Sequence, residues 1–173
     1  MIVLFLFNFK YFIIMKINDV KIPVLPVRNG FTPKELDANG FKGSGVGMTQ
    51  FGVAVGDVIE MPETEADLKG YAIPIRKGDP DAPQQRVFLA LKNGAPAWVG
   101  MTVLTRRDYK MQPTDPVTTF CKDAQSDYER LKLVLGKTIK CTSTVDVEET
   151  VFEAGQPTDK TVVKPRPYCE FVE

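Results

Sequence analysis

The sequence predicts a mainly β fold of the α+β class, an antiparallel β-barrel or half-barrel for which an OB-like barrel is one fit. Three observations carry this prediction. Strand-like runs follow one another at short spacing, an Asn93-Gly94 hairpin signal joins two of them, and a single helical pattern interrupts the series. A parallel sheet would alternate its strands with helices, so the pattern favours antiparallel pairing.

Six runs are rich in the β-branched, aromatic and other apolar residues that strands favour. They cover residues 51–61, 70–77, 86–92, 97–105, 137–149 and 161–172. Long turns are predicted at 77–83 and 153–159, and Ala95-Pro96 is expected to lengthen the Asn93-Gly94 hairpin loop. Because an OB barrel has five strands, one of the six must be added at an edge.

One amphipathic helix is predicted at about 116–135, between the fourth and fifth strands. Thr114 or Asp115 caps it, Pro116 opens it and Gly136 closes it. Apolar residues recur along it at spacings of three and four, namely Val117, Phe120, Cys121, Ala124, Tyr128, Leu131 and Leu135. We therefore expect a solvated helix that packs on the sheet by one stripe.

The first fifteen residues, MIVLFLFNFKYFIIM, are much more apolar than the rest of the chain. A spanning helix needs about 20 apolar residues, and this run is shorter and contains Lys10. It also lacks the basic region and small-residue cleavage site of a signal peptide. We expect that the natural chain starts at Met15. The second alternative is that residues 1–15 form an extra strand or an adhesive apolar tail, and a membrane anchor is the third. The expected organisation is an apolar extension at 1–15, an extended arm and glycine-rich segment at 16–50, and one β-rich domain at 51–173.

Composition argues against several function classes. The chain has 22 basic and 22 acidic residues and no histidine, which excludes histidine-based triads, imidazole bases and His-ligated zinc. Its glycine-rich segment lacks the Lys-Ser or Lys-Thr of a phosphate loop. Three separated cysteines, Cys121, Cys141 and Cys169, predict reduced, buried thiols and a cytoplasmic location. We expect no enzyme, cofactor or metal, with a carboxylate-dependent enzyme as a weaker option.

Strand parity predicts an outward face that combines cations with aromatic rings. Successive residues of a strand point to opposite faces, and residues such as Leu89, Val147 and Val163 are assigned to the inward face. The outward set is Arg76, Arg86, Phe88, Lys92, Trp98, Arg106, Lys140, Lys164, Arg166 and Tyr168. Rings stack nucleic-acid bases at roughly 1–3 kcal/mol each and cations follow the phosphates. Gly100 leaves room on this face for close approach.

Two function classes follow from this face. The first is a non-catalytic module that binds single-stranded nucleic acid, with the acidic segments 57–67 and 142–159 as repulsive guides or protein contacts. The second is a structural or assembly protein of a phage or mobile element, which forms a homo-oligomer through its N-terminal arm. The face can equally be an ordinary polar sheet surface, or one whose rings are covered by residues 17–56 or by a partner subunit. Overall neutrality argues against nucleic acid and local basicity argues for it; a membrane partner is not expected.

Overall fold

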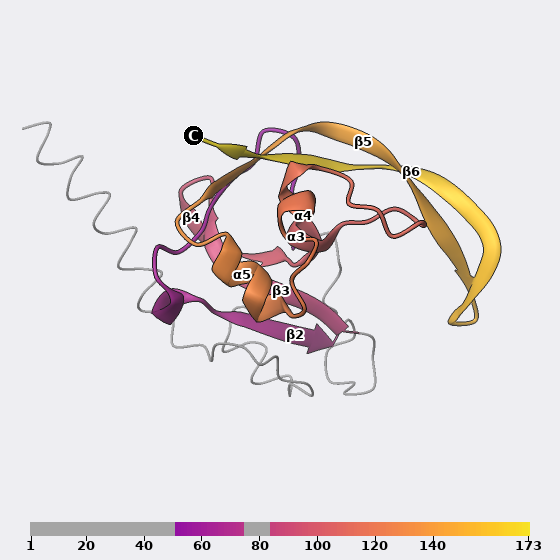
Figure 1. The fold of residues 1–173 in the computed structure, drawn as a ribbon, viewed down its shortest axis with the longest axis horizontal. Coiled ribbons are helices and arrows are strands. Elements are labelled where there is room, and N and C mark those ends of the chain that lie inside the picture. Colours follow the sequence, from indigo (N-terminus) through magenta and orange to yellow (C-terminus); the bar gives the residue numbers. More distant parts are fainter. Residues whose placement is uncertain (1–50, 75–83) are drawn as a thin grey trace, which may run out of the picture.

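A computed structural model of the 173-residue chain describes residues 51–74 and 84–173 (Figure 1). The predicted extension at 1–15, the arm and glycine-rich segment at 16–50, and the turn at 77–83 lie outside these residues. Arg76 of the predicted outward set also lies outside them.

Six strands form one antiparallel sheet: β1 (Val58–Glu60), β2 (Gly70–Pro74), β3 (Gln84–Lys92), β4 (Ala95–Gly100), β5 (Thr138–Glu153) and β6 (Gln156–Val172). Their order is β2-β3-β1-β5-β6, with β4 on the other edge of β3. Within the described strands, no pairing joins β6 back to β2 or β4. The mainly antiparallel β prediction is therefore confirmed, whereas the sheet is open and does not form a closed barrel.

Short helices occupy the connections of this sheet. The 3-10 helix η2 (Glu65–Asp67) links β1 to β2. Helices α3 (Thr102–Thr105), α4 (Pro116–Phe120) and α5 (Asp127–Leu133) lie between β4 and β5 (Figure 1). The predicted strand at 97–105 is thus wrong beyond Gly100. Val103 and Leu104 are both buried, as neighbours on a helix turn can be, whereas a half-exposed strand would bury only one of them.

Both tight hairpins of the sheet have two-residue turns. Asn93 and Gly94 have φ of 53° and 83°, the left-handed values that a twisted hairpin needs. Ala95 and Pro96 do not lengthen this loop, because Pro96 pairs with Leu91 in the edge strand β4. Ala154 and Gly155, with φ of 50° and 79°, likewise reduce the predicted turn at 153–159 to two residues. The resulting β5–β6 ribbon is long and curves away from the rest of the sheet (Figure 1).

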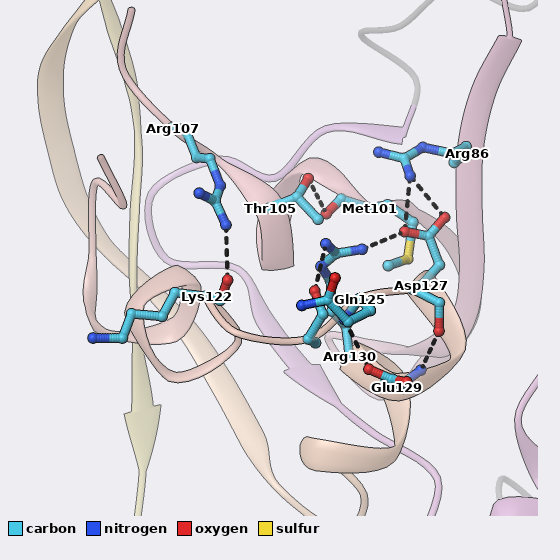
Figure 2. A network of polar contacts seen from close by, with 11 residues as sticks. Arg86, Met101, Thr105, Arg107, Lys122, Gln125, Asp127, Glu129 and Arg130 are labelled. Atoms are coloured by element: carbon cyan, nitrogen blue, oxygen red, sulfur yellow. Dashed lines mark hydrogen bonds and ion pairs between the residues drawn. The ribbon is translucent and has the colours of Figure 1, made fainter. Parts of the chain in front are cut away.

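The single helix predicted at 116–135 is two helices. Its start is confirmed, because Asp115 caps α4 in a reciprocal capping box with Thr118 and Pro116 takes the first position. Ser126 then caps α5 by accepting the Glu129 N–H at 3.2 Å, while the Glu129 carboxylate accepts the Gln125 N–H at 2.7 Å (Figure 2). These local bonds compete with helix continuation. Gly136 has φ of 68°, but its N–H bonds Pro62 O and does not close a helix.

The helices and one face of the sheet enclose the main core. Ile59, Phe88, Val99, Leu131 and Ile139 are among its fully buried side chains. The three cysteines are buried and unpaired, as the sequence predicts, and burial raises the pKa of Cys121 to about 11.

The predicted orientation of β3 is inverted. Phe88, which is 1% exposed, and Ala90 face the main core, whereas Leu89 and Leu91 form a smaller cluster with Trp98. Alternation correctly separated the two sets of residues. It could not identify the core face, because β3 is buried on both sides.

Candidate functional site

The structure does not assemble the aromatic part of the predicted outward face. In the pairing of β3 with β4, Phe88 lies opposite Val99 and Leu89 lies opposite Trp98. Directly opposed residues share a face of the sheet, so Phe88 and Trp98 point to opposite sides. With Phe88 in the core, the prediction of one surface carrying both rings is wrong.

Several predicted cations lie apart from one another. Arg86 reaches α5, where its Nη1 lies 2.9 Å from Asp127 Oδ1, and Arg130 binds the same carboxylate at 3.0 Å (Figure 2). The ion pair between Arg86 and Asp127 links β3 to α5. Lys140 is exposed and lies opposite Glu170 of β6. Tyr168 is half-buried on β6.

Three of the predicted cations do meet, around a single carboxylate that the sequence did not single out. Arg166 makes a two-pronged ion pair with Glu149, through Nε at 2.5 Å and Nη2 at 2.6 Å. Lys164 Nζ and Arg106 Nη1 each lie 3.9 Å from the same carboxylate. We call Arg106, Glu149, Lys164 and Arg166 the Glu149 cluster.

A β-bulge in β5 brings the cluster together. Cys141 pairs with Cys169 and Ser143 with Tyr168, so β5 carries one extra residue at Thr142. Beyond the bulge Val147 lies opposite Lys164, and Val145 opposite Arg166. The prediction had placed these valines inward and the two cations outward, yet each opposed pair shares a face.

A second predicted orientation, in β6, also differs from the structure. Val163, predicted to point inward, is 60% exposed. Its partner across the ribbon is Glu148, so it lies on the face opposite to Val147 and Glu149. β6 has no extra residue at the bulge, so Val163 stays on the same face of this strand as Cys169. Val163 is exposed because it lies in the ribbon, beyond the residues that pack in the main core.

The cluster carries three positive charges and one negative charge. The hydrogen bonds from Arg166 lower the pKa of Glu149, and the same bonds raise the pKa of Arg166. This carboxylate is therefore ionised and mainly committed to one guanidinium. Burial and then the neighbouring charge of Arg166 lower the pKa of Arg106, whose side chain is only 17% exposed. Positive charge thus exceeds what Glu149 neutralises.

The Arg106 guanidinium is the least satisfied group of the cluster. Its contact with Glu149 exceeds hydrogen-bond distance, and no other acceptor binds its N–H groups within residues 51–74 and 84–173. A guanidinium carries five N–H donors in a planar fork that matches carboxylate or phosphate oxygens. The arrangement can therefore accept an anion.

A cavity of about 660 Å³ adjoins the cluster and is lined by Arg106, Glu149 and Arg166. Residues 51–54, the ends of β3 and β4, the start of α3 and part of β6 complete its wall. It therefore lies where the sheet is open, between β4 and β6. Lys92, also from the predicted set, reaches this cavity but is engaged by Gly52 O at 2.9 Å and Asp57 at 3.5 Å.

The two other acids of the cavity are bound by internal donors. Asp115 accepts the N–H groups of Thr118 and Cys169, each at 2.9 Å. Asp57 accepts the Ala54 N–H at 2.8 Å and the Asn93 side-chain amide at 2.9 Å. Their oxygens stabilise the surrounding loops. Among the cations that line the cavity, Arg106 is the one whose side chain makes no hydrogen bond to a described residue.

Sequence reasoning also missed an aromatic pair at the surface. Phe120 of α4 and Phe171 of β6 meet edge to face with ring centroids 5.2 Å apart, and Phe120 is 47% exposed. Lys137 Nζ lies 5.2 and 5.3 Å from the two centroids. Both rings had been assigned to inward stripes, whereas Phe120, the last residue of α4, is at the surface.

No group of three or more acidic or cysteine side chains is placed to hold a metal ion among the residues that the structure describes. In the same part of the chain, no helix has the length and apolar character needed to cross a bilayer. The cytoplasmic location stays a prediction. Neither the family models, nor the curated proteins, nor the solved structures compared with this chain gave a match.

Proposed function

We propose that this protein is a non-catalytic module that binds single-stranded nucleic acid, with the Glu149 cluster as its contact to the phosphates. The observation that carries the proposal is the gathering of Arg106, Lys164 and Arg166 around one carboxylate. The Glu149 cluster has three cations and one carboxylate, and this local surplus of positive charge favours an anionic ligand. Nucleic acid presents regularly spaced phosphates. This proposal replaces the sheet face of the sequence analysis with a site at the open side of the sheet.

The order of the strands supports an OB-like interpretation. If β1 and β2 count as one strand interrupted by η2, five strands remain, with the helices between the third and the fourth. An OB barrel is a partly open five-stranded structure that binds oligonucleotides on one face and through its loops. In this comparison the β5–β6 ribbon takes the place of the loop between the last two strands.

The two faces of the ribbon differ in charge. Lys164 and Arg166 share one face with Glu149, whereas Asp146 and Glu148 lie on the other face. A polyanion would be attracted to the first face and repelled from the second. The sign of charge therefore favours one route for a strand, along the ribbon side that adjoins the cavity.

Titration of labelled oligo-dT at two salt concentrations tests the proposal. We expect binding at low salt that weakens as salt rises, because bound phosphates release counterions. The double variant Arg106→Gln with Lys164→Gln should bind at least tenfold more weakly. A matched double variant, Lys122→Gln with Lys160→Gln, removes two exposed cations away from the cavity and should bind like wild type. Absence of binding at low salt, or equal loss in both double variants, would refute the proposal.

A second candidate function is assembly with other copies of the chain. Its specific support is the apolar surface of the ribbon, where Phe152 is 64% and Val163 is 60% exposed. Light scattering of the full chain tests it. Assembly predicts a defined oligomer that Phe152→Asp and a deletion of residues 16–33 each dissociate, whereas a monomer at all concentrations contradicts it.

A further inference from the structure

We propose that the cavity beside Arg106 binds one nucleotide unit, with the phosphate on the Arg106 guanidinium and the base against the opposite wall. The inference rests on the proposed function only in taking the nucleotide to belong to a strand. A free nucleotide has the same chemistry, and the experiment below separates the two sources.

The phosphate position follows from the unsatisfied donors of Arg106. Its side chain is mostly buried and finds no hydrogen-bond acceptor among the described residues. Burying such donors without acceptors is costly, and a phosphate supplies several acceptor oxygens at the right spacing for the fork.

The base position follows from the remaining wall. Gln85 is 6% exposed, and its amide nitrogen donates to Arg86 O at 3.1 Å, while its carbonyl oxygen has no partner in the described part of the chain. Thr102 also lines this cavity, and its hydroxyl makes no hydrogen bond to another described residue. A buried amide and a hydroxyl can pair with the donors and acceptors of a base edge. Val53 and Pro167 supply apolar surface for the ring.

The size of the cavity limits the ligand to one unit. A volume of about 660 Å³ lies within the roughly 300–1,000 Å³ of pockets that enclose small molecules. It has room for one base, sugar and phosphate but not for a run of nucleotides. A strand would thus insert a terminal or unstacked nucleotide, while its other phosphates follow the Glu149 cluster.

The test is calorimetric titration of the full-length protein with the four deoxynucleoside monophosphates, the matching nucleosides and inorganic phosphate. We expect at least one monophosphate to bind at least tenfold more tightly than both its nucleoside and phosphate alone. Arg106→Gln should weaken that binding at least tenfold, and Arg106→Lys should weaken it less because charge is kept. Lys160→Gln is the matched control and should bind like wild type. Gln85→Leu should reduce the preference among the four bases.

The outcomes separate the two proposals. Equal affinity for the monophosphates and for inorganic phosphate would reduce the cavity to a simple anion site and overturn the inference. Binding of oligo-dT without binding of any monophosphate also overturns it, while the proposed function stands. Binding of a monophosphate without oligo-dT upholds a free-nucleotide pocket and overturns the proposed function. Thermal melts of both Arg106 variants establish that they are folded, and unchanged affinity in a folded Arg106→Gln contradicts the inference.

Discussion

Glu149 is the residue on which the charge balance of the site depends. It neutralises Arg166 through two short hydrogen bonds and lies further from Arg106 and Lys164. The positive charges of Arg106 and Lys164 are therefore neutralised much less than that of Arg166. Because Glu149 comes from β5 and its partners come from β6 and the end of α3, the same carboxylate also ties the ribbon to the body of the protein.

Replacement of Glu149 with Gln should reveal this tie as a pH-dependent loss of stability. The pKa of Glu149 is lowered in the folded protein, so its ion pairs stabilise the fold above the ordinary value of 4.5 and are lost as pH falls through the folded value. In urea unfolding at pH 7, Glu149→Gln should cost about 1 kcal/mol or less, since the pairs are partly exposed. As the pH falls through the folded pKa of Glu149, the difference from wild type should shrink towards zero. A difference that does not change with pH would contradict this role.

At the scale of elements, the break between α4 and α5 shows what periodicity could and could not predict. The apolar stripe correctly placed Val117 and Leu131 in the core. The same stripe runs on through the turn between the helices, because Cys121 is also buried there. Periodicity therefore did not register the interruption. The decisive signal was local, in the spacing of Ser126 and Glu129 that forms the cap of α5.

Ser126→Ala tests whether that cap determines the second helix. Loss of an N-cap side chain typically costs about 1 kcal/mol, and α5 contributes Leu131 to the core. We therefore expect a fall of about 1 kcal/mol in the free energy of unfolding. Ser143→Ala on exposed β5 is the matched control and should be near neutral. A Ser126→Ala protein as stable as wild type would show that α5 forms without its cap.

Two prolines protect the free edge of the ribbon. The backbone oxygen of Glu148 accepts the Tyr109 N–H at 2.7 Å, so the Glu148–Val163 pair directs its backbone groups away from the ribbon. In β6, Pro165 and Pro167 follow Val163 at every second position, so their backbone groups also point away from β5. Neither proline has a backbone N–H that could bond to another strand. The edge therefore lacks donors where another strand would pair.

The double variant Pro165→Thr with Pro167→Thr should restore those donors and promote edge-to-edge pairing. We expect association that increases with protein concentration, measured by light scattering against wild type at the same concentrations. Pro157→Thr, near the turn of the same hairpin, is the control and should have a smaller effect. If the double variant scatters like wild type, the prolines do not protect this edge.

At the scale of the whole molecule, the sequence predicted the antiparallel class, a hairpin at Asn93 and Gly94, and the buried thiols. It did not predict that the hairpin loop has only two residues. It also selected three of the cations that meet at the Glu149 cluster. It could not predict their meeting, because one extra residue at Thr142 changes the pairing of the ribbon without disturbing its apolar pattern. It misplaced Phe88, because a strand buried on both faces gives no sign of which face is the core.

The most direct test of the central claim is the salt dependence of oligo-dT binding. For single strands the slope of log K against log salt falls by about 0.7 for each phosphate contact that is removed. If Arg106 and Lys164 each hold a phosphate, the double variant Arg106→Gln with Lys164→Gln should have a slope shallower by about 1.4. The Lys122→Gln with Lys160→Gln control should keep the wild-type slope. A folded Arg106→Gln with Lys164→Gln protein whose slope equals that of wild type would contradict phosphate binding at the Glu149 cluster.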